Sequence, residues 1–401
     1  MNDKTKLPAW WRPVWICLAG EQAVPNVSPL LPYPPEKVVY THTQMRGSQD
    51  AAKRCKAFFN RLYPEIHVDL LAVPSHDMAA IQRAVATIIE REGSDRTIVN
   101  WTGGTKPMSF AALLSGQSAT TLYFDSREGL MINLDLPDKT FLEIVPKFSI
   151  KDLIQLNADI QQVRQASSIG INAPQTTALL SATLDRELSG KIRLITALKL
   201  FMQEKDVKSL KGRRGGFSEP RAPLPNPLKA YSEKTSAHFL KAVKDDGLMQ
   251  KHADGRFLPT AKCLDFLEGL WWEAYVGGKM REGLAQLGLA PDREHMLMNL
   301  EIKWPGPGTP RNEFDVVFTH NDRLYLISCT TASEGETEKR RNQVEHFADR
   351  LGGRFARAMI ACTLDGNAFD KVAARRGPAL IMPRLEEWLD PKTILDRWFK
   401  M

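Results

Sequence analysis

The chain has 401 residues, of which 43% are hydrophobic and 25% are charged, so it is long enough for two or three globular domains. This composition excludes a disordered chain, a collagen-like chain and a disulfide scaffold, and no apolar run approaches the roughly 18 residues of a membrane span. We expect no signal peptide, because the first fifteen residues contain no apolar stretch. Five scattered cysteines without CxxC spacing predict a reducing cytoplasm and no zinc site.

The net charge of +7 is unevenly distributed along the chain. Residues 151–260 carry 18 Lys and Arg against 11 Asp and Glu, whereas the segments before and after are nearly neutral. A locally basic segment indicates either a polyanionic partner or an ordinary solvated surface, and the sequence leaves both open.

The first 150 residues alternate between strand and helix patterns. In chain order we expect strands at 14–18 and 37–41, a helix at 49–62, a strand at 66–73, a helix at 78–92, a strand at 97–101, a helix at 108–114 and a strand at 120–124. Gly129 predicts a closing hairpin with a strand at 131–134. This alternation predicts a mostly parallel, Rossmann-like α/β sheet with helices on both faces.

Residues 151–260 have a different pattern. We expect helices at 151–165, 183–203 and 231–246, a short strand at 255–258, and a Gly- and Pro-rich linker at 211–227. A basic cluster precedes the linker and consists of Lys205, Lys208, Lys211, Arg213 and Arg214. Only Phe201 and Phe217 lie near it, which weakens a base-stacking function.

The last 140 residues begin with an amphipathic helix at 264–276. Strands follow at 296–302, 312–318 and 323–329, then a charged helix at 334–351 and a strand at 355–361. The chain therefore divides into an α/β domain at 1–150, a connecting segment at 151–260 and a second α/β domain at 261–401.

The clearest motif is residues 100–108, NWTGGTKPM, which follows a strand and opens a helix. Its two glycines allow close approach of a ligand to the backbone, and the N–H groups at a helix N-terminus favour anions. It is neither a Walker loop nor a GxGxxG loop. The motif indicates a phosphate-binding turn, and the alternative is an ordinary strand-to-helix turn that requires glycine.

A second loop, residues 19–26 (AGEQAVPN), follows the first strand. Both loops leave the carboxyl ends of parallel strands, so we expect them to meet at one site. Thr41, at the end of the second strand, is a third candidate at this edge.

Together, the two loops resemble those of the CRISPR-associated Rossmann fold, or CARF domain, of the type III CRISPR ancillary nucleases. The resemblance implies a homodimer that binds a cyclic oligoadenylate across its two-fold axis, with cyclic tetra-adenylate as the activating ligand. The implied ligand-binding residues are Gly20, Glu21, Gln22, Asn26, Thr41, Thr102, Gly103, Gly104, Thr105 and Lys106.

The same family carries a C-terminal restriction-endonuclease-like domain with the pattern Asp…(Asp/Glu)-x-Lys, preceded by a connecting helical, winged-helix-like segment. Residues 312–318 (NEFDVVF), the Asn321-Asp322 turn and the next strand resemble its core, and Glu273 matches its helix glutamate. Carboxylates hold hard divalent cations, so the resemblance implies Mg²⁺ or Mn²⁺ at Asp315 and Glu273. However, Ser328 and Thr330 stand where the family has glutamate and lysine.

Two interpretations of this departure remain. In the first, the missing groups come from the next helix, where the available side chains are Glu334, Glu336, Glu338, Lys339 and Glu345. The protein is then a metal-dependent nuclease that cuts DNA, RNA or both after ligand binding, with candidate catalytic residues Asp315, Glu273, Glu313, Ser328, Thr330 and Lys339. In the second, the nuclease domain is degenerate and the protein binds the cyclic oligoadenylate, or cleaves the ring itself through Lys106, Thr105 and Gln22.

Overall fold

The computed structural model describes residues 11–126, 129–133, 141–143, 148–165, 174–188, 193–210, 224, 233–251, 253, 257–309 and 311–401. Most of the predicted linker and the basic residues Lys211, Arg213 and Arg214 lie outside this set, as does Phe217. The chain divides into two compact units. The first comprises Met1–Ile160, Thr319–Leu324 and Asp349–Ala356, and the second comprises Gln161–Phe318, Tyr325–Ala348 and Arg357–Met401.

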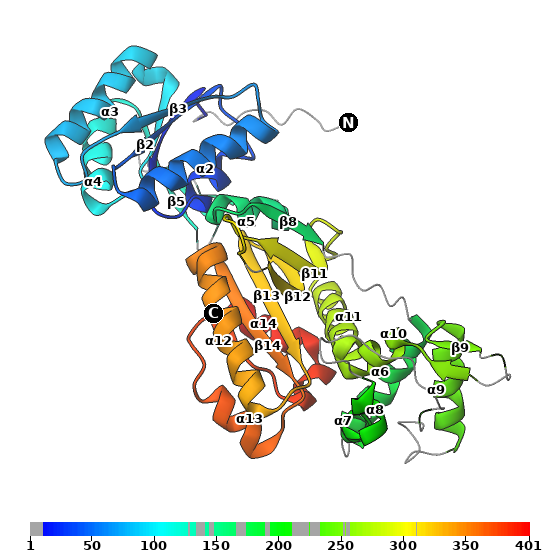
Figure 1. Ribbon diagram of the computed structural model, residues 1–401. Helices are drawn as coiled ribbons and strands as arrows, with labels where there is room; N and C mark the ends of the chain where they lie inside the picture. Colours follow the sequence, from blue (N-terminus) through cyan, green and yellow to red (C-terminus); the bar gives the residue numbers. More distant parts are fainter. Residues whose placement is uncertain are drawn as a thin grey trace. The chain divides into compact units, whose positions relative to one another are not determined.

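The first unit contains a seven-stranded sheet in the order β3-β2-β1-β4-β5-β6-β7 (Figure 1). The strands are β1 (Val14–Ala19), β2 (Lys37–His42), β3 (His67–Ala72), β4 (Thr97–Asn100), β5 (Thr120–Asp125), β6 (Leu130–Asn133) and β7 (Phe141–Glu143). The first five in sheet order are parallel, and β6 and β7 extend the edge antiparallel. The predicted parallel sheet with a closing hairpin is thus confirmed.

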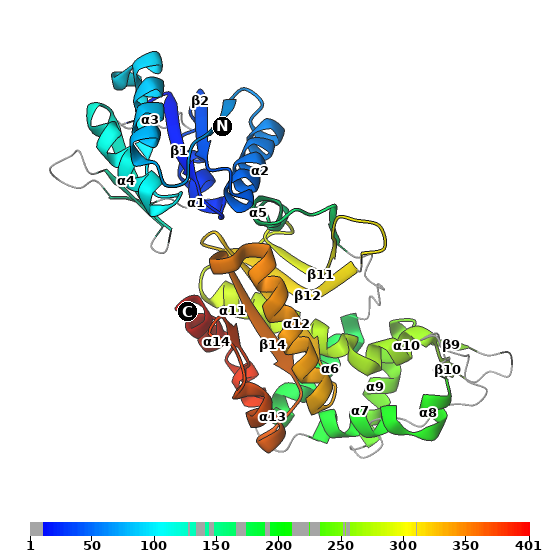
Figure 2. The same ribbon diagram turned by 60° about the vertical axis from the view of Figure 1, so that its left-hand side comes forward.

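Helices cover both faces of this sheet, as the alternation predicts. They are α1 (Val24–Val27), α2 (Arg46–Leu62), α3 (Met78–Glu92), α4 (Lys106–Ser115) and α5 (Ile150–Asn157). Helices α3 and α4 lie side by side on one face, where Ile81 and Val85 pack against Ile16 and Val39 of the strands (Figure 2). Helix α2 contacts β1, β2 and β3, and α5 packs against it.

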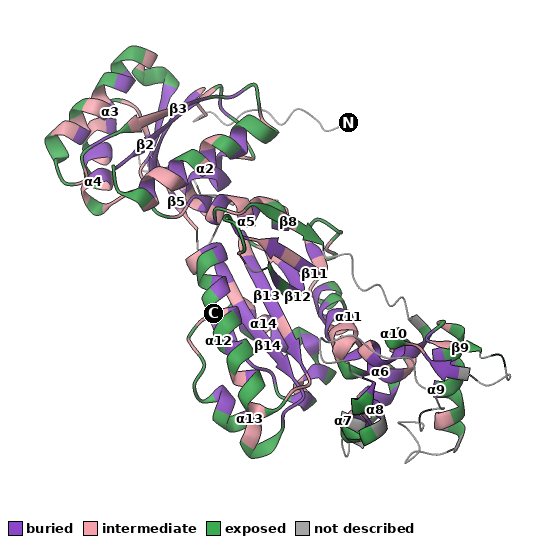
Figure 3. Cartoon of the chain, viewed as in Figure 1, coloured by how far each residue is buried: buried purple, intermediate pink, exposed green. Residues whose placement is uncertain are grey.

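The second unit contains a six-stranded sheet in the order β15-β14-β13-β12-β11-β8. Its strands are β8 (Gln162–Gln165), β11 (Met296–Lys303), β12 (Arg311–His320), β13 (Arg323–Thr330), β14 (Ala356–Cys362) and β15 (Leu380–Ile381). Strands β13 and β14 are buried along most of their length (Figure 3).

The predicted helix at 151–165 is wrong in its second half. Helix α5 ends at Asn157, and residues 162–165 form strand β8 antiparallel to β11. Pairing with the sheet edge supplies backbone hydrogen bonds, and Arg164 forms an ion pair with Glu301 at 3.1 Å, so tertiary contacts override the local helical pattern.

The helical segment of the second unit consists of α6 (Pro174–Leu188), α7 (Arg193–Gln203), α8 (Lys205–Ser209) and α9 (Glu233–Asp245), followed by the antiparallel pair β9 (Met249–Lys251) and β10 (Phe257–Pro259). The helix predicted at 183–203 covers the end of α6 and the whole of α7, and residues 189–192 between them lie outside the described residues. Helices followed by a hairpin are the elements expected of a winged-helix-like segment.

The nuclease-like core is completed by α10 (Ala261–Asp265), α11 (Trp271–Gln286), α12 (Glu334–Gly352), α13 (Gly366–Ala373) and α14 (Pro391–Phe399). Short 3₁₀ helices occupy Ser28–Leu30, Ser94–Arg96, Gly116–Ser118, Gly353–Phe355 and Leu385–Leu389, and a π-helical turn spans Phe266–Leu270. Trp272 is fully buried, and its indole N–H donates to the Ala361 carbonyl at 2.9 Å, which fixes α11 against β14. Among the described residues, no helix is long and apolar enough to cross a membrane.

Candidate functional site

The two loops expected to form a ligand site lie against each other at the carboxyl ends of β1 and β4. These strands are adjacent and parallel, with Cys17 level with Asn100. A Cβ placed on Gly20 would come within 3.2 Å of the Gly104 nitrogen, so the backbones of the loops approach closely. The predicted meeting of the loops is therefore present in the structure.

Gly103 and Gly104 allow this approach for different reasons. A Cβ on Gly103 would overlap the Leu18 carbonyl oxygen and lie 3.0 Å from the Asn26 amide. Gly104 has a φ of 77°, a region in which side chains are disfavoured. Both glycines are therefore required by the packing of the turn on β1, whatever ligand it binds.

The hydroxyl groups of the turn are engaged within the protein. Thr102 Oγ1 donates to Asn100 Oδ1 at 2.6 Å and accepts from the Phe124 N–H at 2.6 Å. Thr105 caps helix α4 by accepting from the Met108 N–H. These bonds fix the shape of the turn and leave Lys106, the exposed first residue of α4, as its one cation.

The remaining predicted ligand residues have varied environments. Asn26 is fully buried, and its Oδ1 has no hydrogen-bond partner among the described residues. Glu21 is exposed, and its side chain lies beside Gly47 at the start of α2. Gln22 Nε2 lies beside Gly353, which belongs to the same unit. Thr41 is buried and donates to the Cys17 carbonyl at 3.4 Å, so it is turned into the sheet.

In the second unit, Asp315 lies at the centre of a group of charged residues. It is buried on β12, and its Oδ2 accepts from the Cys329 N–H at 2.5 Å and from the Ser328 hydroxyl at 3.4 Å. Burial raises the pKa of Asp315, and the Cys329 N–H and the Arg340 guanidinium partly oppose that rise. The Arg340 Nη1 atom lies 3.9 Å from Asp315 Oδ2.

Glu273 faces Asp315 from the first turn of helix α11. Burial raises the pKa of Glu273, and repulsion from Asp315 and Glu313 raises it further. Glu273 is the third residue after the π-helical turn, a feature that is frequent at functional sites. Thr331 Oγ1 donates to the Glu268 carbonyl at 2.8 Å, which ties this turn to the segment that follows β13.

The strand opposite Asp315 has an irregular backbone. Met298 pairs with Val316 and Leu300 with Phe314, so Asn299 lies opposite Asp315, where it adopts a φ of 54°. Its Oδ1 is buried and has no partner among the described residues. Such left-handed residues concentrate at functional sites. No sequence pattern singled out Asn299.

The helix side chains considered as replacements for the missing glutamate and lysine have other partners. Lys339 is 74% exposed and binds Glu336 at 2.6 Å. The other glutamates of α12 are likewise engaged: Glu334 with Lys371, Glu338 with Arg375, and Glu345 with the Gly377 N–H. Arg340, which the sequence reasoning did not consider, is the residue of α12 that lies at Asp315.

Thr330 is buried, and its Oγ1 accepts from the Ala332 N–H at 3.1 Å. Glu313 is exposed on the same strand as Asp315 and is paired in register with Glu301; burial and repulsion from Glu301 raise its pKa. Glu273 and Asp315 thus form a carboxylate pair, with Glu313 at its edge and Arg340 as its counter-charge.

This carboxylate pair fits a divalent cation of the magnesium type. Asp315 is buried, Glu273 is half-buried, and the two charges repel each other, so the pair offers the hard oxygen ligands that Mg²⁺ and Mn²⁺ prefer. Mg²⁺ is commonly held by one or two carboxylates with waters and substrate phosphates. Within the described part of the chain, no group of three or more His, Cys, Asp or Glu side chains is arranged to hold a metal ion. The described residues therefore fit a cation that would be held by two carboxylates, Glu273 and Asp315.

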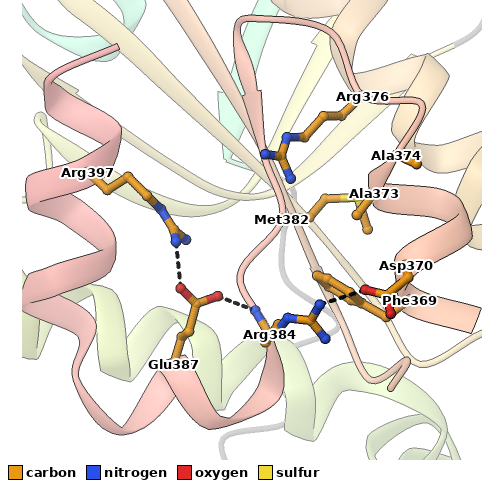
Figure 4. Close-up of a pocket in the computed structure, with 9 residues that line it drawn as sticks. All are labelled: Phe369, Asp370, Ala373, Ala374, Arg376, Met382, Arg384, Glu387 and Arg397. Atoms are coloured by element: carbon orange, nitrogen blue, oxygen red, sulfur yellow. Dashed lines mark hydrogen bonds and ion pairs between the residues drawn. The ribbon is translucent and has the colours of Figure 1, made fainter. Parts of the chain in front are cut away.

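A separate cavity of about 550 Å³ is lined by residues of α13, of the segments on either side of β15, of the 3₁₀ helix Leu385–Leu389 and of α14 (Figure 4). Arg384 binds Asp370 and Arg397 binds Glu387, each at 2.6 Å, and Arg376 points into the same cavity. None of the residues that form the carboxylate pair lines it.

Comparison with protein families assigns a class to each unit's principal domain. Residues 14–153 match the family described as the Card1 CARF domain, and residues 261–400 match the family described as the Card1-like endonuclease domain. The chain therefore belongs to the class of proteins that join a CARF domain to a Card1-like endonuclease domain, and the resemblance noted in its two loops is confirmed.

Solved structures with the same fold include three that span nearly the whole chain. Protein VC1899 from Vibrio cholerae is 19% identical with a TM-score of 0.75, covering 96% of this chain and 98% of its own. Can2 from Sulfobacillus thermosulfidooxidans, solved with cyclic tetra-adenylate, is 19% identical with a TM-score of 0.65, covering 96% and 99%. A type III CRISPR defence DNA nuclease activated by cyclic oligoadenylate is 18% identical with a TM-score of 0.51, covering 94% of this chain and 54% of its own. No curated protein matches the sequence.

Proposed function

We propose that this protein is an effector nuclease of type III CRISPR defence that becomes active when a homodimer of its CARF domains binds cyclic tetra-adenylate. The observation that carries the nuclease assignment is the carboxylate pair of half-buried Glu273 and buried Asp315 in a domain of the Card1-like endonuclease family. Two solved structures of the same fold support the ligand, because one contains cyclic tetra-adenylate and the other is a nuclease activated by cyclic oligoadenylate.

At the sensor, we assign ligand binding to the turn formed by Thr102–Lys106 and the Gly20 loop packed on it. A phosphodiester at the start of α4 would meet the positive end of the helix dipole, the Lys106 ammonium group and glycine backbone without intervening side chains, while Thr105 already holds the Met108 N–H. Ligand binding activates the enzyme only if the ligand has a higher affinity for the cleaving arrangement than for the resting one.

At the nuclease centre, Glu273 and Asp315 would hold Mg²⁺ or Mn²⁺, which when bound neutralises phosphate charge and lowers the pKa of water. The Cys329 N–H holds Asp315 in a fixed orientation. Burial raises the pKa of both carboxylates, so a bound cation would displace the protons that they hold in its absence, and the proton of the attacking water would pass to Glu313 or to solvent. DNA, RNA or both remain candidate substrates.

We divide the chain into a sensor at residues 1–150, a connecting segment at 151–260 and a nuclease domain at 261–401. Five free cysteines, all buried, are consistent with a protein that works in the cytoplasm.

The test is cleavage of labelled single- and double-stranded DNA and RNA by the full-length protein, with and without cyclic tetra-adenylate and Mn²⁺. We expect cleavage only when both are present, and we expect Asp315→Ala to abolish it while ligand binding is retained. Absence of cleavage of every substrate under all conditions would refute the nuclease assignment.

A second candidate function rests on Ser328 and Thr330. Serine is a weak neutral metal ligand and threonine carries no charge, so the pair fits a protein that binds the cyclic oligoadenylate without cutting nucleic acid. Tight ligand binding with intact nucleic acid would favour it. Incubation of the ligand in EDTA, followed by chromatography, tests whether Gln22, Thr105 and Lys106 open the ring.

A further inference from the structure

Arg340 occupies a distinctive position among the basic residues of the nuclease domain. Its Nη1 atom donates to the Cys329 carbonyl at 3.1 Å and lies 3.9 Å from Asp315 Oδ2. Within the described residues, its charge is the one that lowers the pKa of Asp315, Glu273 and Glu313 alike. The guanidinium therefore faces the centre of the carboxylate group.

Arg340 also has free capacity to bind a substrate. Its side chain is 48% exposed, and the two contacts that the structure gives it both involve Nη1. A guanidinium has five N–H donors in a planar fork that matches the oxygens of a phosphate. The remaining donors can therefore reach a phosphodiester that enters beside Asp315.

We propose that Arg340 is a catalytic residue of this nuclease, supplying to the scissile phosphodiester the positive charge that Thr330 lacks. This inference rests on the proposed nuclease function. During hydrolysis, the bond between the water oxygen and phosphorus forms while the P–O ester bond breaks. The water gives up a proton and the departing oxygen takes one, and Arg340 binds the non-bridging oxygen on which negative charge grows.

An arginine at this position differs from the lysine of the related motif in its proton chemistry and in its geometry. A guanidinium stays protonated in proteins, so Arg340 cannot exchange a proton with water. Arg340 therefore acts by charge and hydrogen bonding alone, and proton transfer is left to the carboxylates and solvent. Lysine at this position restores the charge but not the forked geometry.

The decisive experiment compares Arg340→Ala and Arg340→Lys with the matched control Lys339→Ala in the full-length protein. Lys339 is the preceding residue on the same helix and pairs with Glu336 on the exposed face, so its loss removes one positive charge without touching Asp315. With cyclic tetra-adenylate and Mn²⁺, we expect Arg340→Ala to lower the cleavage rate roughly 10²–10³-fold. Arg340→Lys should recover part of that loss, and Lys339→Ala should cleave like the wild type.

A second readout does not depend on turnover. In Ca²⁺, the affinity for labelled nucleic acid should fall in Arg340→Ala and stay unchanged in Lys339→Ala, with equal melting temperatures confirming that both fold. Equal cleavage by wild type and Arg340→Ala, or equal loss of affinity in both variants, would overturn the role of Arg340. An inactive wild type would instead refute the proposed function, and the affinity comparison would still decide whether Arg340 contacts the phosphate.

The cavity lined by α13, α14 and the segments on either side of β15 supports an independent inference. Three guanidinium groups converge on it, and two carboxylates, Asp370 and Glu387, neutralise two of them and hold Arg384 and Arg397 in place (Figure 4). The cavity therefore carries one net positive charge in a domain that has 20 Lys and Arg against 21 Asp and Glu. Its volume of about 550 Å³ is in the range that accommodates a nucleotide.

We infer that this cavity binds a backbone phosphate of a nucleic acid strand through Arg376. The guanidinium of Arg376 points into the cavity, has no ion-pair partner among the described residues, and can bind a phosphate through paired N–H groups (Figure 4). Electrostatic attraction in this nearly neutral domain then comes from a local cluster of arginines.

The test measures binding of fluorescein-labelled single-stranded DNA and RNA by anisotropy in EDTA, so that no cleavage is required. Arg376→Glu should weaken binding and lower the dependence of affinity on salt by about one phosphate contact. Arg281→Glu, an exposed arginine on α11, is the control for net charge and should have a smaller effect. Equal effects of the two variants would overturn the inference, and inhibition of binding by free nucleotides alone would assign the cavity to a small ligand instead.

Discussion

Asp322 offers a quantitative test of the electrostatics of the first unit. It lies in the two-residue turn between β12 and β13, where Asn321 and Asp322 both have positive φ, as a type I′ hairpin requires. Its Oδ2 lies 2.5 Å from the Ser28 hydroxyl, which also lies 3.1 Å from the Val24 carbonyl. A hydroxyl has one proton, so both contacts are satisfied only when Asp322 is protonated and donates to Ser28.

The pKa of Asp322 agrees with this arrangement. Burial raises it from the ordinary 3.8 to about 7, and the bond from Ser28 opposes the rise only in part. Because a tenfold change in a proton-binding constant corresponds to about 1.4 kcal/mol, ionised Asp322 costs the folded state about 4 kcal/mol. The folded protein binds the proton more tightly than the unfolded chain, so stability falls as the pH rises from about 4 to about 7 and changes little above that.

The substitution Asp322→Asn should remove this dependence, because its amide can donate to Ser28 at every pH. Between pH 5 and pH 8, the wild type should lose roughly 2–3 kcal/mol from this group, and the variant should not. The difference in melting temperature between the two proteins across this range is the measurement. Comparing the two proteins removes the contributions of His320 and of other groups that titrate in both of them. Asp349→Asn, at an exposed position, is the control. Identical pH slopes for the wild type and Asp322→Asn would refute the reasoning.

The remaining predictions concern the two candidate sites and the core. Gly103→Ala should abolish binding of cyclic tetra-adenylate in calorimetry, because the new methyl group overlaps the end of β1, whereas Gly278→Ala on α11 meets no neighbour and should leave it unchanged; full binding by the first variant would contradict the close packing of the loops. Asn299→Ala should lower stability to denaturant by about 1 kcal/mol more than Asn299→Gly, since glycine adopts this positive φ without the steric cost that the alanine Cβ incurs; equal losses would count against strain there. Ser328→Glu should tighten Mn²⁺ binding by adding a third carboxylate beside Asp315, and unchanged affinity would show that the pair does not bind the metal. Trp272→Phe should cost about 1–3 kcal/mol, because it leaves a buried carbonyl unpaired, and an unchanged midpoint of unfolding would exclude that contribution.

Most of the fold could be predicted because hydrophobic periodicity and turn chemistry agree with the tertiary structure. The strands at 14–18 and 97–101 are short, mostly apolar or β-branched runs, and β1 and β4 are buried in the sheet. The Asn321-Asp322 pair is a turn signal between two strands. The failure at 162–165 has a different origin. Strand β8 is mostly polar, with Val163 as its one apolar residue, and only its partner β11, far away in sequence, provides a reason for it to be extended.

The close approach of the two loops at the ends of β1 and β4 was predictable for a related reason. A pair of glycines directly after a strand indicates a turn in the sequence alone. The structure shows why Gly103 is needed there, because a Cβ at this position would overlap the Leu18 carbonyl oxygen. Whether the hydroxyl groups of that turn face a ligand was not predictable. Thr102 bonds to Asn100 and Phe124 because of the register of β4 and β5, which no local pattern contains.

The side of helix α12 on which a residue lies determines whether Lys339 or Arg340 is the cation beside Asp315. The sequence contains the information that separates the two. The buried face of α12 is marked by Thr337, Val344, Phe347 and Leu351. Successive residues of a helix are rotated by about 100° around its axis, so residues three or four positions apart lie on the same face. Arg340 follows Thr337 by three residues and precedes Val344 by four, and it therefore lies beside the buried face. Lys339 shares the opposite side with Glu336. Charged residues occur all around α12, and Lys339 and Arg340 are almost equally far from Ser328 along the chain. Distance along the chain therefore did not show which of them replaces the missing cation. The signal that separates the two residues is the direction around the helix axis in which the few apolar side chains point. It predicts that a cation lost from a strand can be replaced only from positions on the same side of the next helix as its buried side chains.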